Sequence, residues 1–185
     1  MLVVMHRRQS TIGRTRARGQ ALVEFALVAP IFFLLVFSVI QLGIMFGGQN
    51  GLVAATRELA RYAAPFRVKT AVDAANVCAD VRLTKQLNTF LQESIPGYVA
   101  GDVGTRTVTY SWLPNALPAG ATQTWFVQMQ VHVAYHFPMY VPIVGGILDD
   151  HLLPTNPSKQ LDATETMRIE NEDLTATYGT VSCSI

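Results

Sequence analysis

Two residues at the start of a long apolar run, Gly19 and Glu24, have types and spacing that could support chemistry. Glu24 immediately precedes the uncharged segment FALVAPIFFLLVFSVI. A carboxyl group at the edge of hydrocarbon is costly and usually needs a partner. It could pair with a cation buried beside it, or stay hydrated at the membrane interface with Arg18 as a loose neighbour. Gly19 has no side chain, so another protein can approach its backbone closely.

The two cysteines of the chain, Cys78 and Cys183, both follow the apolar run. In an oxidising compartment they could form a disulfide. Two unpaired thiols are the alternative, because sequence spacing does not reveal the Cα separation that a disulfide requires. Cys78 could also serve as a small buried hydrophobic residue of a helix.

Motifs of catalysis and metal binding are weak or missing in this sequence. It has no Ser/His/Asp signature, no glycine-rich phosphate loop and no HExxH motif. His132 and His136 share one side of a predicted strand, but at ~3.3 Å per residue they lie about 13 Å apart, too far for one metal ion. Asp149, Asp150 and His151 could bind a divalent cation, although adjacent acidic residues are more often solvated. We therefore expect a protein that is not an enzyme, with no cofactor and no metal.

Basic charge is concentrated ahead of the apolar run. Five arginines and no acidic residue occur in residues 1–19. The whole chain has a formal net charge of +1, yet residues 20–185 contain nine Lys and Arg against thirteen Asp and Glu, a net charge of −4. The absence of basic clustering after the leader argues against nucleic acid as a partner. Because Lys and Arg beside a span stay inside the cell, residues 1–19 are predicted to be a cytoplasmic leader.

A membrane-spanning helix is predicted over residues 20–46. From Ala21 to Phe46 there are 26 residues, interrupted by the polar residues Glu24, Ser38 and Gln41, and ~20 suffice to cross a bilayer. A cleaved secretory signal is the main rival, but its apolar region usually has only ~7–15 residues. Here the apolar stretch continues into a further helical pattern, which favours an anchor.

The remaining residues, 47–185, are predicted to form an exported α+β domain. Helical periodicity continues to Ala64. Alternation of apolar and polar residues predicts a small antiparallel sheet, with strands over Arg106–Trp112, Thr124–Phe137 and Leu161–Ile169. Between the last two strands, Pro138–Pro157 reads as a long loop. A second helix is predicted over Ala71–Gln92, with an apolar face of Val72, Ala75, Ala79, Leu83, Leu87 and Leu91.

The segment from about residue 17 to residue 64 resembles the amino-terminal block of the TadE-like proteins, minor pseudopilins of the tight-adherence (Flp, type IV-like) pilus system. The shared features are Gly19, then Glu24 and Phe25 at the start of an apolar helix, an early proline at Pro30, and an Arg-Glu-x-Ala-Arg pattern at residues 57–61. The resemblance implies a pilin-like fold, in which the sheet packs on the outer half of the amino-terminal helix.

The same resemblance implies a processing and assembly site. A prepilin peptidase would cut after Gly19 at the cytoplasmic face and leave Gln20 as the new amino terminus. Glu24 would neutralise the freed amine of a neighbouring subunit within the filament, and Phe25 would begin the helix that packs there. The implied partners are the bacterial inner membrane, the peptidase, other pilin or pseudopilin subunits and the pilus assembly machinery.

A second interpretation comes from a different class of protein. The chain could be an unprocessed, signal-anchored envelope protein, whose exported domain binds a ligand or stabilises a larger complex. Both interpretations place residues 47–185 outside the cytoplasm, in the periplasm or beyond. They differ in whether residues 1–19 are removed.

Overall fold

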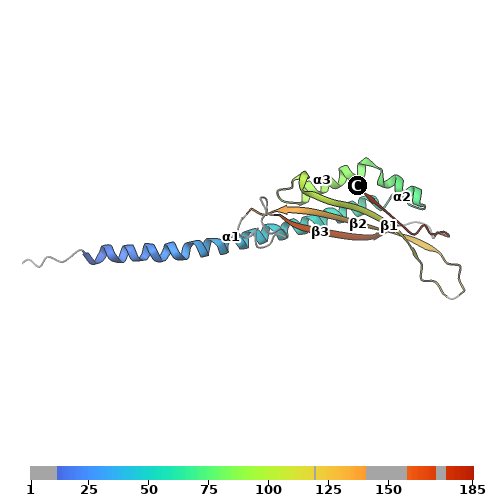
Figure 1. The fold of residues 1–185 in the computed structure, drawn as a ribbon. Helices are drawn as coiled ribbons and strands as arrows, with labels where there is room; N and C mark the ends of the chain where they lie inside the picture. Colours follow the sequence, from blue (N-terminus) through green and yellow to red (C-terminus); the bar gives the residue numbers. More distant parts are fainter. Residues whose placement is uncertain (1–11, 119, 141–157, 170–173) are drawn as a thin grey trace, which may run out of the picture. The chain divides into compact units, whose positions relative to one another are not determined.

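The computed structural model describes residues 12–118, 120–140, 158–169 and 174–185. It divides into two compact units, Met1–Ile40 and Gln41–Ile185, which are described separately. The elements in chain order are α1 (Ile12–Ala63), α2 (Ala71–Cys78), α3 (Val81–Ser94), the short 3-10 helix η1 (Ala100–Asp102), β1 (Val103–Pro114), β2 (Trp125–Pro138), β3 (Ser158–Arg168) and β4 (Thr180–Ser184) (Figure 1). This content confirms the predicted α+β class.

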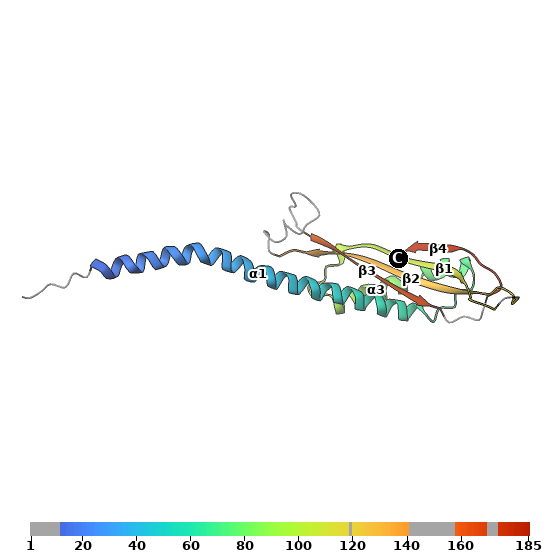
Figure 2. The same ribbon diagram turned by 90° about the horizontal axis from the view of Figure 1, so that it is seen from below.

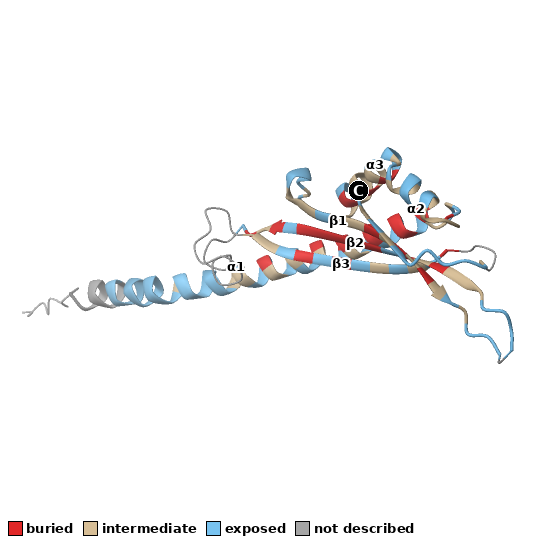
Figure 3. Cartoon of the chain, turned by 45° about the vertical axis from the view of Figure 1, so that its right-hand side comes forward, coloured by how far each residue is buried: buried red, intermediate tan, exposed pale blue. Residues whose placement is uncertain are grey.

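The first unit contributes the amino-terminal part of α1, whose apolar side chains are exposed around the helix. Leu22 is 70% exposed, Phe25 67% and Ile31 71%, and this stretch is pale blue in Figure 3. An 18-residue window of α1 has a mean hydropathy of 2.6, and none of that window is buried. Exposed apolar side chains on every side of a helix are typical of a segment whose solvent is lipid. By length and composition α1 can therefore cross a membrane, which supports membrane anchoring.

Gln41 is the first residue of the second unit and is a buried polar residue of α1. Its side-chain oxygen accepts a hydrogen bond from the Tyr140 backbone N–H at 3.1 Å, and its side-chain nitrogen lies 3.4 Å from the Met139 sulfur. Residues 41–46 of the predicted span thus belong to the second unit. At 1.5 Å per residue, residues 20–40 alone extend about 31 Å, enough for the ~30 Å of hydrocarbon in a bilayer.

The second unit is built on a four-stranded sheet with strand order β3-β2-β1-β4, and Figure 2 shows these strands side by side. Every neighbouring pair is antiparallel. At the centre of the sheet Val131 of β2 pairs with Val108 of β1 on one side and with Glu165 of β3 on the other. Val108 in turn pairs with Cys183 of β4. β3 and β4 are therefore the two edge strands.

One face of this sheet forms the core of the second unit. Alternate residues of β2 from Val127 to Phe137 are fully buried, as the alternation in the sequence predicts. The same core cluster includes leucines of α1 and α3, so these helices cover that face; the buried segments are red in Figure 3. Full burial contributes about 1.5–3 kcal/mol for each large apolar side chain. The helical contribution consists of Leu52, Ala55, Leu59, Ala60, Ala63, Ala74, Leu83, Leu87 and Leu91.

The predicted single helix over 71–92 is wrong, because the structure has two helices there. Asp80 caps the start of α3, and its carboxylate accepts a hydrogen bond from the Arg82 backbone N–H at 2.9 Å. A capping aspartate competes with helix continuation, since its side chain satisfies the free N–H groups of a new first turn. Of the predicted apolar face only Leu83, Leu87 and Leu91 are buried, whereas Val72, at 67% exposed, faces solvent.

The start of α2 is fixed by a capping box. The Thr70 hydroxyl accepts from the Asp73 N–H at 3.2 Å, and the Asp73 carboxylate accepts from the Thr70 N–H at 2.9 Å. The Asp73 carboxylate accepts hydrogen bonds from the backbone N–H groups of Thr70 and Lys69, and these bonds lower the pKa of Asp73. Two of the orphan donors at a helix start are thereby satisfied.

The strand predictions differ from the structure mainly at the carboxy terminus. The three predicted strands correspond to β1, β2 and β3, each with bounds shifted by a few residues. β4 (Thr180–Ser184) was missed, because its five residues are too short to show a clear alternation. Of the predicted loop Pro138–Pro157, residues 141–157 lie outside the described part, and so do Asp149, Asp150 and His151.

Helix α1 and the end of α3 approach each other closely at Gly51. A Cβ atom at this buried glycine would meet the Ser94 carbonyl oxygen, and it would lie 2.8 Å from the Ser94 carbonyl carbon and 3.3 Å from the Ile95 Cα. These are backbone atoms, so they cannot move aside cheaply. We expect Gly51→Ala to lower the free energy of unfolding by about 1–3 kcal/mol, measured by urea denaturation of the full chain.

Gly47 is the matched control in the same helix. A Cβ atom there meets nothing within 4 Å. Gly47→Ala should therefore stabilise the helix by about 0.5–1 kcal/mol, since alanine loses less backbone entropy than glycine. Equal effects of the two substitutions would contradict the close packing at Gly51.

Candidate processing and assembly site

Gly19 lies within α1 and has open surroundings. It is exposed, and a Cβ atom there would meet nothing within 4 Å. Glycine in the interior of a helix costs about 0.5–1 kcal/mol relative to alanine. The packing of the described residues therefore does not require glycine at this position, and its backbone is accessible from outside.

Glu24 is exposed on the same helix, one turn after Gln20. The Gln20 side-chain nitrogen donates a hydrogen bond to the Glu24 carboxylate at 3.0 Å. This i to i+4 contact satisfies part of the carboxylate but brings no positive charge. Among the side chains that the structure describes, from residue 19 onward, Glu24 has no cationic partner; the side chain of Arg18 lies outside them.

The side chains around Glu24 are apolar and exposed. Val23 is 61% exposed and Phe25 67% exposed. A carboxylate in such surroundings is strongly disfavoured in lipid unless a cation approaches it. Gly19, Gln20, Glu24 and Phe25 thus lie within two turns of one helix, and a cation for Glu24 can be supplied by another chain.

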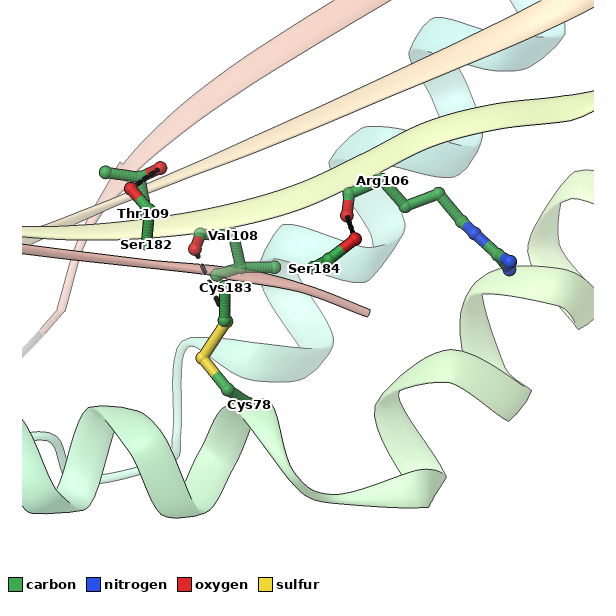
Figure 4. Close-up of a disulfide and its surroundings, with 7 residues drawn as sticks. All are labelled: Cys78, Arg106, Val108, Thr109, Ser182, Cys183 and Ser184. Atoms are coloured by element: carbon green, nitrogen blue, oxygen red, sulfur yellow. Dashed lines mark hydrogen bonds between the residues drawn. A yellow bond between two sulfur atoms is a disulfide. The ribbon is translucent and has the colours of Figure 1, made fainter.

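Cys78 and Cys183 are joined in a disulfide, with their Cα atoms 6.0 Å apart (Figure 4). Cys78 ends α2, and Cys183 lies on β4 next to Val108, so the bond ties the edge strand to a helix across the buried face. A side-chain hydrogen bond also joins β4 to β1: the hydroxyl oxygens of Ser182 and Thr109 lie 2.8 Å apart. Sequence spacing alone could not decide between this bond and two free thiols.

The charged residues of the pattern at residues 57–61, Arg57, Glu58 and Arg61, are exposed on α1. Arg61 contacts Glu58 of the same helix at 3.0 Å, and Arg57 contacts Glu165 of β3 at 3.4 Å. Exposed ion pairs of this kind contribute about 0–1 kcal/mol each. The contact from α1 to β3 joins segments more than 100 residues apart, so no local sequence signal could have indicated it. In the described part of the chain no cluster of His, Cys, Asp and Glu could hold a metal ion.

Part of helix α1 is similar to one known protein family. The sequence model of the TadE-like protein family matches residues 19–61, so it begins at Gly19 and ends at Arg61. This match confirms the resemblance stated for the amino-terminal block and indicates a Tad pilus-associated protein. Neither the search of curated proteins nor that of solved structures finds a match.

Proposed function

We propose that this chain is a minor pseudopilin of a Flp/Tad-type adhesion pilus. A prepilin peptidase removes residues 1–19 by cleavage after Gly19, and the mature protein takes part in assembly or initiation of the pilus together with other pilin or pseudopilin subunits. The chain is not an enzyme. It resides in the bacterial inner membrane as a single-pass protein, with its amino terminus in the cytoplasm and residues 47–185 in the periplasm or beyond.

The observation that carries this proposal is the Gly19–Glu24 pair at the head of an exposed apolar helix. The TadE-like match begins at that glycine. Glu24 is a carboxylate without a cation among the described side chains, surrounded by apolar ones. Cleavage after Gly19 would create an amine at Gln20, and the same amine on a neighbouring subunit is the cation that Glu24 lacks. Assembly therefore depends on processing.

The disulfide supports the orientation in the proposal. Disulfides persist in oxidising compartments such as the bacterial periplasm and are rare in the cytosol. Cys78 and Cys183 both lie in the second unit, and the five arginines that favour a cytoplasmic position all precede it. These observations together favour export of the second unit.

The experiment measures the intact mass of the full chain, purified from membranes with and without its cognate prepilin peptidase. We expect the protein to lose residues 1–19 only when the peptidase is present. Gly19→Val should lower the rate of cleavage at least about tenfold, since a branched side chain keeps the backbone away from the peptidase. The surroundings of Gly19 are open, so the variant should fold normally.

Gly43→Val is the matched control. It makes the same change in the same helix, at a position where a Cβ atom also meets nothing within 4 Å, and it should leave cleavage unchanged. A wild-type chain that keeps its leader in the presence of an active peptidase would contradict the proposal. It would favour the unprocessed, signal-anchored envelope protein instead.

A further inference from the structure

A cavity of about 450 Å³ opens at the surface where α1 ends, and three arginines line it. Arg61 comes from the last turn of α1, Arg67 from the connection to α2, and Arg168 from the end of β3. Its other lining residues are small or apolar, namely Ala64, Pro65 and Met167. The chain after residue 19 has a net charge of −4. The three arginines around this cavity therefore form a positively charged patch on a chain that is negative as a whole.

Two carbonyl groups at the end of α1 accept hydrogen bonds from backbone N–H groups. The Ala64 N–H donates to the Ala60 carbonyl at 2.9 Å, and the Phe66 N–H donates to the Ala63 carbonyl at 3.1 Å. Backbone donors thus satisfy these carbonyls at the end of the helix, as in most helix endings. These two carbonyl groups therefore do not require an arginine side chain as a donor.

Two of the three arginines contact described side chains, and one of these contacts leaves the positive charge available. The Arg168 guanidinium lies over the Phe126 ring, 4.3 Å from its centroid, and a stacked guanidinium keeps its charge. Arg61 contacts Glu58 at 3.0 Å, which offsets one charge. Arg67 is exposed and has no ion pair among the described residues. Among the described residues, three guanidinium groups against one carboxylate leave a surplus of two positive charges.

We propose that this cavity binds an acidic segment of a partner protein through at least two neighbouring carboxylates. The guanidinium group matches the planar carboxylate and can bind it through two hydrogen bonds. The small or apolar lining residues Met167, Pro65 and Ala64 can contact the methylene groups of such a segment. A long polyanion such as nucleic acid does not fit, because the rest of the exported chain repels it.

The proposal is tested on the full chain in neutral detergent micelles, with binding of fluorescein-labelled hexaglutamate followed by anisotropy. We expect salt-sensitive binding. Arg67→Glu should weaken it about tenfold or more, the loss expected when a charge-assisted contact is replaced by repulsion. Lys85→Glu, an equal charge change on exposed α3 away from the cavity, should alter affinity by less than about twofold. Circular dichroism checks that both variants fold.

Four outcomes would overturn the proposal. The first is that the wild-type chain does not bind hexaglutamate. The second is that Arg67→Glu and Lys85→Glu weaken binding equally, which would mean that binding depends on the net charge of the chain and not on the cavity. Inorganic phosphate could displace the peptide at lower concentration than unlabelled hexaglutamate does, which indicates a small-anion site. Finally, phosphatidylglycerol vesicles could bind the wild-type chain but not the Arg67→Glu variant, while hexaglutamate binds neither of these two proteins. That result would indicate a lipid site. The measurement needs no pilus and no peptidase, so its failure is separate from failure of the proposed function.

Discussion

Reducing the Cys78–Cys183 disulfide is expected to lower the free energy of unfolding of the second unit by about 4.7 kcal/mol. The two cysteines are 105 residues apart, and a cross-link over so long a loop removes a large entropy from the unfolded chain. The bond also anchors β4, which pairs only with β1 in the described sheet. A loss of this size is a large part of the total stability of a small domain.

Urea denaturation of the full chain, with and without reductant, measures this loss. Trp112 on β1 is 4% exposed and lies beside β4, so its fluorescence reports unfolding. Hydrogen exchange should show that the amides of β4 lose protection first, because an edge strand with one neighbour opens before the central strands.

The control is the double variant Cys78→Ser and Cys183→Ser, which should have the stability of the reduced wild-type chain and should not respond to reductant. A stability change below about 1 kcal/mol on reduction would contradict this prediction. That result would mean that β4 and α2 are held by packing and hydrogen bonds alone.

The features predicted correctly from the sequence are those with a long, regular pattern of apolar residues. The long central strand Trp125–Pro138 has many repeats of one alternation, and the amino-terminal part of α1 is a long, nearly unbroken run of apolar residues. In β2 six alternate residues from Val127 to Phe137 are buried, and a slip by one residue would expose all of them. Such elements are fixed by the hydrophobic pattern of the chain itself.

The features missed depend on single side chains or on contacts between distant segments. The break between α2 and α3 follows from the capping hydrogen bonds of Asp80, which periodicity does not register. β4 is short and is held by its pairing with β1 and by the bond from Cys183 to Cys78. Their formation depends on tertiary structure, so a local reading of the sequence cannot establish them.

The same distinction applies to the candidate sites. Gly19 and Glu24 could be found from the sequence, because both lie on one helix and their spacing is local. The arginine cavity could not, since Arg61 and Arg67 meet Arg168 only through the packing of α1 against β3. A cluster made by three separate segments has no signature in the order of residues.

Glu24→Gln is expected to leave cleavage after Gly19 intact and to weaken association with neighbouring subunits at least about 100-fold. The variant keeps the shape of the side chain, and it can still accept the hydrogen bond from Gln20. It removes the charge that the proposed function pairs with the amine of another subunit. Losing one member of an ion pair in a low-dielectric environment costs about 3–5 kcal/mol, because the remaining charge is left unpaired.

The measurement is the amount of this chain that co-purifies with pilus subunits from membranes, together with the number of pili per cell. Glu93→Gln makes the same change at an exposed position of α3 and should have no effect on either quantity. If Glu24→Gln assembles like the wild-type chain, the assembly role of Glu24 is excluded.

Combining the two helix substitutions tests whether Glu24 acts through the new amino terminus. Gly19→Val strongly reduces formation of the amine, and Glu24→Gln removes the carboxylate that it would meet. If these two groups form one ion pair between subunits, the double variant should assemble no worse than the more impaired single variant, since each change already destroys the pair. Additive losses would mean that Glu24 has a partner other than the amine, and that the spacing of five residues from Gly19 has a different cause.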